Sequence, residues 1–128
     1  MIVAGIGCRA GAPARDIEAA LAAALAQVRL SPSALDISAT SSAKSSEPGI
    51  VAASAARRAR LIAVPQAELA AAGARVVTRS ARVLAVTGVP SLAEAAALAA
   101  AGPDARLVVA RVVVGSATCA LATAGDGP

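Results

Sequence analysis

The chain is strongly apolar yet contains no aromatic side chain. Hydrophobic residues make up 57% of its 128 positions, 39 residues are alanine, and Phe, Trp and Tyr are all absent. The core must therefore be built from Ala, Val, Leu and Ile, whose small side chains allow helices to pack close to a sheet. This length suits one domain, large enough to bury about two thirds of the surface of the unfolded chain.

Two absences exclude whole classes of function. Histidine is missing, so the chain has no Ser-His or Cys-His nucleophile pair, no histidine general base and no histidine ligand for a metal. Without aromatic rings there is no platform on which nucleic-acid bases could stack. We therefore expect no metal site and no nucleic-acid partner.

The charge pattern argues against a membrane segment. The longest stretch without a charge, Val112 to Gly125, has 14 residues, fewer than the ~18 to 20 that cross a bilayer. The first residues are typical of a strand and a glycine turn rather than of a signal peptide. Cys8 and Cys119 have no CxxC spacing, which fits a reducing compartment. We expect a cytoplasmic protein with no membrane partner.

Apolar runs alternate with helical patterns along the chain. Strands are expected at 2–7, 34–40, 60–64 and 82–86, with a hairpin around Gly115 within 106–123, and helices at 13–27, 47–58, 66–72 and about 91–102. This order predicts an α/β fold, a single three-layer α/β/α domain with a largely parallel or mixed sheet. We expect the domain to span residues 1–122 and a flexible tail to follow over 123–128.

A glycine-containing turn, Gly5–Gly11, joins the first strand to the first helix. Such a turn presents backbone N–H groups and the helix dipole to an anion, and Arg9 would add a bidentate clamp. Its G-x-G-x-x-x-G spacing departs from the G-x-G-x-x-G fingerprint of dinucleotide sites. We therefore predict a carboxylate or phosphate ligand and no cofactor; the alternative is a plain strand-to-helix turn.

A polar stretch, Thr40–Gly49, follows the second strand, where ligands of open α/β sheets usually bind. It contains Lys44, the single lysine among twelve basic residues, and Glu47 three positions later. The two predict an acid–base pair, or a grip on an anionic ligand in which Glu47 orients the ammonium. In the alternative, Ser45 or Ser46 caps the next helix, Glu47 complements its dipole and Lys44 is solvated.

A third candidate is the Thr87–Gly88 turn, which lies before a helix start. Ser91 and Glu94 have the S-x-x-E spacing of a capping box, and capping is sufficient to explain both. Thr87 and Gly88 are either ligand contacts or a simple turn. At the end of the chain, Thr118 either faces the functional edge of the sheet or is an ordinary strand residue.

The net charge of +4 allows an anionic partner. Six of the arginines cluster along the middle of the chain and form either a phosphate-binding stripe or solvated helix faces: Arg57, Arg58, Arg60, Arg75, Arg79 and Arg82.

Four motifs in order carry a family resemblance: GIGCRAG at 5–11, AKSSEPG at 43–49, GVPSLAEAAAL at 88–98 and ATCALA at 117–122. Together they resemble the CobE family, which is similar to the C-terminal domain of CbiG, in cobalamin biosynthesis. The resemblance covers nearly the whole chain. It implies a three-layer α/β domain that acts in corrin ring construction, and CbiG itself is associated with opening a precorrin lactone and losing a two-carbon fragment.

The residues and the resemblance together define a predicted site. The substrate-binding residues are expected to be Gly7, Cys8, Arg9, Gly11, Lys44, Glu47, Thr87, Gly88 and Ser91. Lys44 and Glu47 are the candidate catalytic residues. Corrin precursors carry many acetate and propionate carboxylates, so a cleft that offers helix N-termini, Arg and Lys fits them.

Three functions follow from this site and resemblance. The first is binding of a polycarboxylate tetrapyrrole, a precorrin or corrin intermediate, by a carrier between pathway enzymes. The second is a hydrolase that acts on a precorrin lactone or on its extruded two-carbon fragment. The third is a non-catalytic interaction module that holds other cobalamin-pathway enzymes together.

Overall fold

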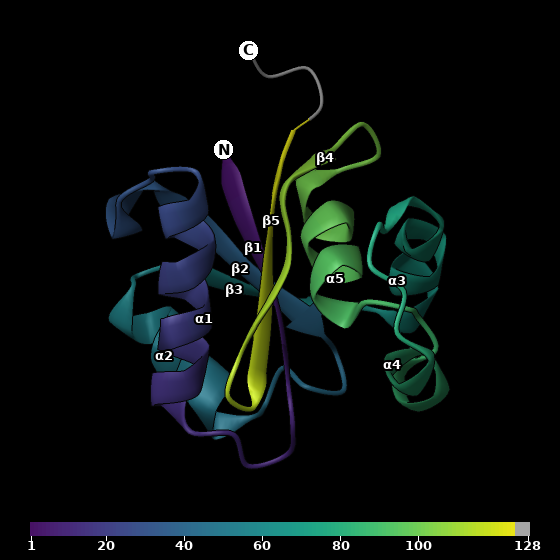
Figure 1. The fold of residues 1–128 in the computed structure, drawn as a ribbon, viewed down its shortest axis with the longest axis horizontal. Coiled ribbons are helices and arrows are strands. Elements are labelled where there is room, and N and C mark those ends of the chain that lie inside the picture. The colour runs from purple at the N-terminus through teal and green to yellow at the C-terminus, as the bar shows by residue number, and fades with distance from the viewer. Residues whose placement is uncertain (125–128) are drawn as a thin grey trace.

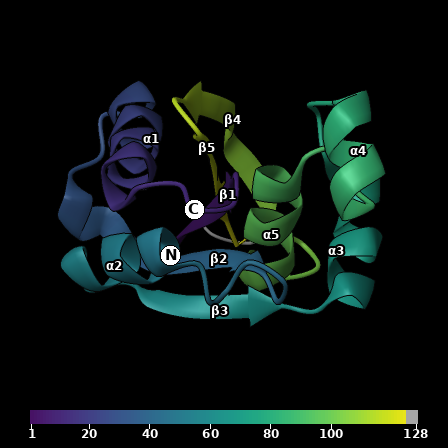
Figure 2. The same ribbon diagram turned by 90° about the horizontal axis from the view of Figure 1, so that it is seen from below.

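A computed structural model describes residues 1–124 as a sheet with helices on both faces (Figures 1 and 2). The strands are β1 (Ile2–Cys8), β2 (Leu35–Ser41), β3 (Arg60–Val64), β4 (Arg106–Val114) and β5 (Ala117–Thr123). The helices are α1 (Ala14–Gln27), α2 (Pro48–Ala56), α3 (Gln66–Ala72), α4 (Ala81–Thr87) and α5 (Leu92–Ala101), with short 3-10 turns at Pro32–Ala34 and Gly73–Arg75.

The sheet is open and mixed. Its strand order is β3-β2-β1-β5-β4. The first three strands run parallel, whereas β5 runs antiparallel to both β1 and β4. The predicted α/β fold with a mixed sheet is confirmed, and so is the hairpin around Gly115. The carboxyl ends of the parallel strands and the β4–β5 turn meet at one end of the sheet, the lower end in Figure 1.

Each face of the sheet carries its own hydrophobic core. Helices α1 and α2 cover one face and α5 and α3 cover the other (Figures 1 and 2). Ile17 and Leu21 of α1 are fully buried in the first core, and Leu69 and Leu98 in the second. With no aromatic rings to fill space, these layers depend on short distances between backbones.

Gly5 shows how close the layers come. A β-carbon at this position would overlap the carbonyl oxygen of Ala93 and lie 2.6 Å from the amide nitrogen of Ala97. The backbone of α5 therefore rests directly on β1. The first glycine of the GIG motif serves this helix contact, which explains it without a bound anion.

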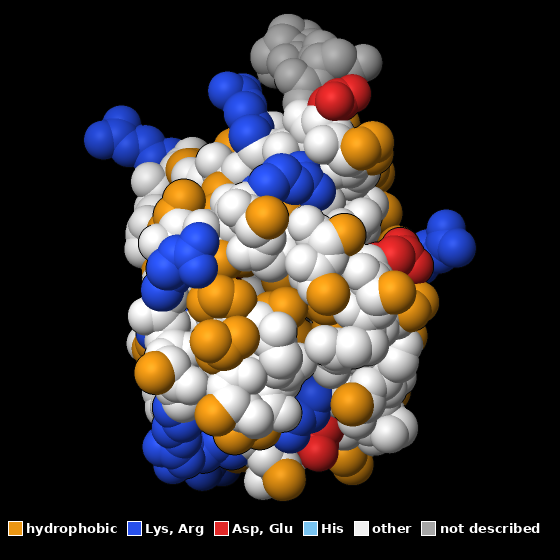
Figure 3. Space-filling view, turned by 90° about the vertical axis from the view of Figure 1, so that its right-hand side faces the viewer, with side chains coloured by type: hydrophobic (Ala, Val, Ile, Leu, Met, Phe, Trp, Pro, Cys, Tyr) orange, Lys and Arg blue, Asp and Glu red, His pale blue; other side chains and the backbone are white. Residues whose placement is uncertain are grey.

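The prediction of a strand at 82–86 is wrong, because this segment is helix α4. The Ser80 hydroxyl accepts a hydrogen bond from the amide of Val83 at 3.2 Å, which caps the helix start. Gly88, with φ of 82°, ends the helix in the left-handed conformation. These two caps prevail over the apolar alternation of the segment. Figure 3, which faces the α3 and α4 side, shows hydrophobic side chains among arginines; Leu84 and Val86 of α4 are exposed.

The start of β1 and the end of β5 lie together at the other end of the sheet. Thr123, the first residue of the predicted tail, belongs to β5, and its hydroxyl donates a hydrogen bond to the carbonyl of Met1. Ala124 follows the strand without regular structure, and residues 125–128 of that predicted tail lie outside the described residues. Within residues 1–124 no single helix is long and apolar enough to cross a membrane; α4 and α5 pass that test only as a pair bent by 63°.

Candidate ligand-binding site

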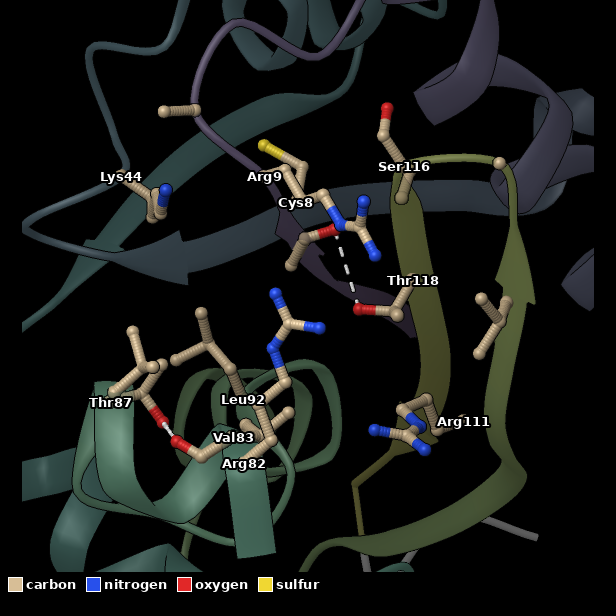
Figure 4. Close-up of a pocket in the computed structure, with 16 residues that line it drawn as sticks. Cys8, Arg9, Lys44, Arg82, Val83, Thr87, Leu92, Arg111, Ser116 and Thr118 are labelled. Atoms are coloured by element: carbon tan, nitrogen blue, oxygen red, sulfur yellow. Dashed lines mark hydrogen bonds between the residues drawn. The ribbon is translucent and has the colours of Figure 1, made fainter. Parts of the chain in front are cut away.

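A cavity of about 630 Å³ opens at the end of the sheet where β1 and β2 finish and the β4–β5 hairpin turns (Figure 4). This volume lies in the range of small-molecule sites. The lining comes from β1 and the loop after it, the loop after β2, helix α4, the start of α5 and the hairpin: Gly7, Cys8, Arg9, Ala10, Lys44, Arg82, Val83, Val86, Thr87, Leu92, Arg111, Val113, Gly115, Ser116, Ala117 and Thr118. Its place fits the rule that open α/β sheets bind ligands at the carboxyl ends of their strands.

Charge in the lining has one sign. Four cationic side chains border the cavity, Arg9, Lys44, Arg82 and Arg111, and within residues 1–124 no carboxylate does. Figure 4 shows Arg9 from the β1–α1 loop and Arg82 from α4 extending into the same space, with Arg111 on the strand side. Valines and Leu92 supply apolar surface between them. The arrangement suits a ligand that carries several anionic groups on an apolar body.

Three amides of the loop between β1 and α1 are engaged within the protein. The amide of Arg9 donates to the carbonyl of Ser116 at 3.0 Å, and the amide of Ala12 donates to the carbonyl of Arg9 at 3.1 Å. The amide of Gly11 donates to Oε1 of Glu47 at 3.0 Å. These three donors are therefore satisfied within the protein, and the loop offers the cavity the exposed Arg9 side chain together with the backbone of Ala10.

Glu47 braces this loop from the start of α2. It is the N-cap residue of α2 but makes no side-chain cap, and its carboxylate holds Gly11 instead. The predicted cap from Ser45 or Ser46 is not formed; the Ser45 hydroxyl donates to the carbonyl of Ser42. Lys44 lines the cavity whereas Glu47 does not. An acid–base role for this pair stays a prediction.

Cys8 lines the cavity in a half-buried position. Burial raises the pKa of its thiol, the Lys44 ammonium acts to lower that pKa and the Glu47 carboxylate acts to raise it. The net shift is upward, so the thiol is protonated at neutral pH and is a poor nucleophile. Cys119 is fully buried in the core beneath, where burial raises its pKa to about 12.

Gly7 and Thr118 form part of the inner wall. The Thr118 hydroxyl donates to the carbonyl of Gly7 at 3.3 Å, across the β1–β5 pair (Figure 4). A β-carbon on Gly7 would lie 2.7 Å from that hydroxyl oxygen, so the second glycine of the motif leaves room for Thr118. Thr118 lines the cavity, and a functional role for this edge of the sheet stays a prediction.

Helix α4 forms the opposite wall. The Thr87 hydroxyl donates to the carbonyl oxygen of Val83 at 2.7 Å and lies 3.1 Å from that of Val89, and the Gln66 side chain donates to the carbonyl of Thr87. Thr87 lines the cavity, but Gly88 does not. The turn at Gly88 has a sufficient explanation in ending the helix.

The predicted residues divide into two groups. Five line the cavity: Gly7, Cys8, Arg9, Lys44 and Thr87. The other four do not line it: Gly11, Glu47, Gly88 and Ser91. Sequence reasoning missed Arg111 and Ser116, although a single arginine inside the apolar run VVARVVV was an available signal.

The arginine cluster does not form one stripe. Arg57, at the end of α2, donates to the carbonyl of Glu18 on one face of the sheet. Arg75, on the other face, donates to the carbonyls of Pro103 and Ala105. Of the six clustered arginines, only Arg82 lines the cavity.

Glu94 is the buried carboxylate next to the site. The Ser91 hydroxyl accepts a hydrogen bond from its amide, so this half of the predicted capping box is formed. The reciprocal half is not, because the Glu94 carboxylate accepts from the amides of Val77, Thr78 and Arg111 at 2.7, 3.0 and 2.9 Å. Burial alone would raise the pKa of Glu94, but hydrogen bonds from Thr78, Arg111 and Val77 lower it overall.

Fold and site together define the class: a single open-sheet α/β domain with a cationic cavity at the carboxyl ends of its parallel strands. Residues 2–122 match the CbiG_C family, described as cobalamin synthesis G C-terminus. The chain belongs to this CobE and CbiG C-terminal family, whose members act in cobalamin biosynthesis.

Individual relatives agree with that assignment. Protein CobE of Sinorhizobium sp is 38% identical over 126 residues, which cover 94% of this chain and 79% of the relative. A crystal structure of CobE superposes with a TM-score of 0.88 at 35% identity, covering 95% of this chain and 89% of that one. The cobalamin biosynthesis protein chiG of Agrobacterium tumefaciens gives a TM-score of 0.77 at 43% identity, covering 98% of this chain and all of that one.

A more distant structure shares the fold alone. The cobalamin biosynthesis protein G homologue of Sulfolobus solfataricus is 21% identical with a TM-score of 0.70, and the match covers 96% of this chain but 36% of that one.

Proposed function

We propose that this protein binds a polycarboxylate tetrapyrrole, a precorrin or corrin intermediate, and carries it between enzymes of the cobalamin pathway. The observation that carries the proposal is the cavity lining, in which four cationic side chains and no described carboxylate surround apolar surface. Acetate and propionate groups on the rim of a tetrapyrrole are the natural counterparts of such a lining.

The chemistry of the four cations supports this ligand class. Arginine donates two parallel hydrogen bonds to one carboxylate, so Arg9, Arg82 and Arg111 suit side-chain carboxylates that are held at fixed positions on a ring. Lys44 supplies a compact charge at the opposite border of the cavity. The chain has no aromatic residue that could stack on the ring. The apolar side chains of α4 and Leu92 would contact it instead.

The hydrolase alternative has less support from the geometry. Hydrolysis of a lactone needs an activated nucleophile or a general base beside the substrate. The Cys8 thiol has a raised pKa, and the Glu47 carboxylate is engaged with Gly11 outside the lining. A mass-spectrometric product assay tests the alternative: an intermediate that disappears no faster with the protein present rules out catalysis.

The binding proposal is tested by titrating the protein with a corrinoid that bears free carboxylates and following the visible spectrum at low and high salt. The proposal predicts a saturable shift that is weakened by salt. Substituting Arg9→Ala or Lys44→Ala should weaken binding by about 1 to 3 kcal/mol as charge-assisted hydrogen bonds are lost.

Arg60→Ala is the matched control, because Arg60 is an exposed arginine on β3 that does not line the cavity. It should bind as the unaltered protein does. Unchanged affinity in both Arg9→Ala and Lys44→Ala would contradict the site. No spectral shift with several corrinoids would favour the interaction module, which predicts capture of pathway enzymes without a ligand.

A further inference from the structure

Strand β4 is irregular at the residue that it contributes to the cavity. In the register with β5, Val109 lies opposite Leu121 and Val112 lies opposite Cys119, so β4 advances three residues while β5 advances two. Arg111 lies within this extra-residue step and lines the cavity. Bulges of this kind re-aim a side chain and are frequent beside functional sites.

The amide freed at the bulge has one partner, the carboxylate of Glu94. The amide of Arg111 donates to Oε2 of Glu94 at 2.9 Å. Glu94 belongs to the first turn of α5, is fully buried, and lies one turn after the cap residue Ser91. The buried Glu94 carboxylate therefore fixes the backbone of β4 at the residue whose side chain enters the cavity, Arg111.

The second oxygen of the same carboxylate holds the opposite wall. Oε1 of Glu94 accepts from the amides of Val77 and Thr78 at 2.7 and 3.0 Å. These residues lead directly into Ser80, the cap of α4, and so to Arg82 in the cavity. One side chain thus links the segments that carry two of the four cations.

We propose that Glu94 is a positioning residue for the cavity, which aligns Arg111 on β4 and Arg82 on α4 toward the same ligand. This inference rests on the proposed binding function. Glu94 does not itself line the cavity. Glu94 acts on binding only through the backbone of β4 and of the segment before α4. The effect of substituting it should therefore depend on Arg111 and Arg82, the side chains that these segments carry.

A double-mutant cycle with a free-carboxylate corrinoid tests the proposal. In Glu94→Gln the amide group keeps the shape but turns a donor toward one of the backbone N–H groups. We expect Arg111→Ala to weaken binding about tenfold, Glu94→Gln to weaken it at least as much because it also releases the Arg82 side, and the double variant to be no weaker than Glu94→Gln alone. Glu94→Gln combined with Arg9→Ala should instead be additive, because Arg9 lies on a loop that Glu94 does not hold.

Leu98→Ala is the control for a merely structural role. It removes a buried apolar side chain of the same helix that lies outside the cavity lining and makes no hydrogen bond to β4 or to the segment before α4, so it should lower stability and leave affinity unchanged. An equal loss of affinity in Leu98→Ala, or a double variant about tenfold weaker than Glu94→Gln alone, would overturn the proposal. If the unaltered protein fails to bind, the proposed function fails and this inference with it; if it binds and Glu94→Gln binds equally well, this inference alone fails.

Amide hydrogen exchange on the unaltered protein gives a second test that does not depend on how a variant folds. Ligand binding should slow exchange at Val77, Thr78 and Arg111 together, because one carboxylate accepts all three amides. Slower exchange at Arg111 with no change at Val77 and Thr78 would overturn the coupling.

Discussion

Two glutamates brace the two sides of the cavity, and they do so at different depths. Glu47, half-buried at the start of α2, accepts one amide from the β1–α1 loop. Glu94, fully buried in α5, accepts three amides from two segments. Both follow a loop and precede or open a helix, so they look alike in sequence. The two differ in depth of burial and in the number of amides that they accept, and the fold alone decides both. Glu47 therefore supports a single loop, whereas Glu94 connects two segments of the cavity wall.

The largest loss of stability should follow the substitution of Glu94. Glu94→Gln replaces a charged acceptor of three amides and leaves a buried donor opposed to a donor, which should lower the free energy of unfolding by about 3 kcal/mol. Urea denaturation followed by far-ultraviolet circular dichroism measures the loss. A loss below about 1 kcal/mol would show that the two glutamates are equivalent after all.

The pH dependence of stability sharpens the same contrast. The folded protein holds the pKa of Glu94 below its ordinary value of 4.5. The stabilisation is therefore complete above that ordinary value and is lost as the pH falls through the lowered folded pKa. Asp16, whose pKa is lowered by hydrogen bonds from Ser116, adds an effect of the same sign.

Urea midpoints measured from pH 7 to pH 3 check this dependence. The unaltered protein should lose stability below about pH 4.5, while Glu94→Gln should show a shallower decline. Parallel curves for the two proteins would mean that Glu94 titrates alike in the folded and unfolded chains.

Ser91→Ala should have an intermediate effect. Its hydroxyl accepts the amide of Glu94 and caps α5, and loss of such a cap costs about 1 kcal/mol. The change is read from the urea midpoint at neutral pH. A cost as large as that of Glu94→Gln would indicate that the helix start, rather than the three amides, accounts for the stability.

Glu47→Gln should have the smallest effect. Its single hydrogen bond to Gly11 is partly open to solvent, and the glutamine oxygen can accept the same amide, so the loss should stay below about 1 kcal/mol. Thermal unfolding in parallel with Glu94→Gln measures it. A larger loss would make the β1–α1 loop, rather than the α5 side, the more critical support.

The fold was largely predictable because most elements carry local signals. The helix at 66–72 and the strand at 60–64 agree with the structure to the residue. The helices expected at 13–27, 47–58 and about 91–102 agree within two residues at each end. The exception is α4, where the apolar alternation of 82–86 favoured a strand. Its caps, Ser80 and Gly88, are short-range features that the periodicity concealed.

The site residues that could be predicted are those that directly follow a parallel strand in the sequence. Arg9 and Lys44 follow strands, so their place at the sheet edge follows from the α/β rule. Arg111 reaches the cavity because a bulge in β4 and the fold of the hairpin bring it there, and neither is visible in a local pattern. Glu94 was assigned to capping because its amide partners lie 16 and 17 residues away on either side.

A map of backbone amide shifts during titration with a free-carboxylate corrinoid would show directly whether this cavity binds the ligand. We expect the shifts to concentrate at the cavity, at Gly7, Arg9, Lys44 and Thr118, with α4 and the β4 bulge responding as well. Shifts confined to the α1 and α2 face, or none at saturating ligand, would contradict it.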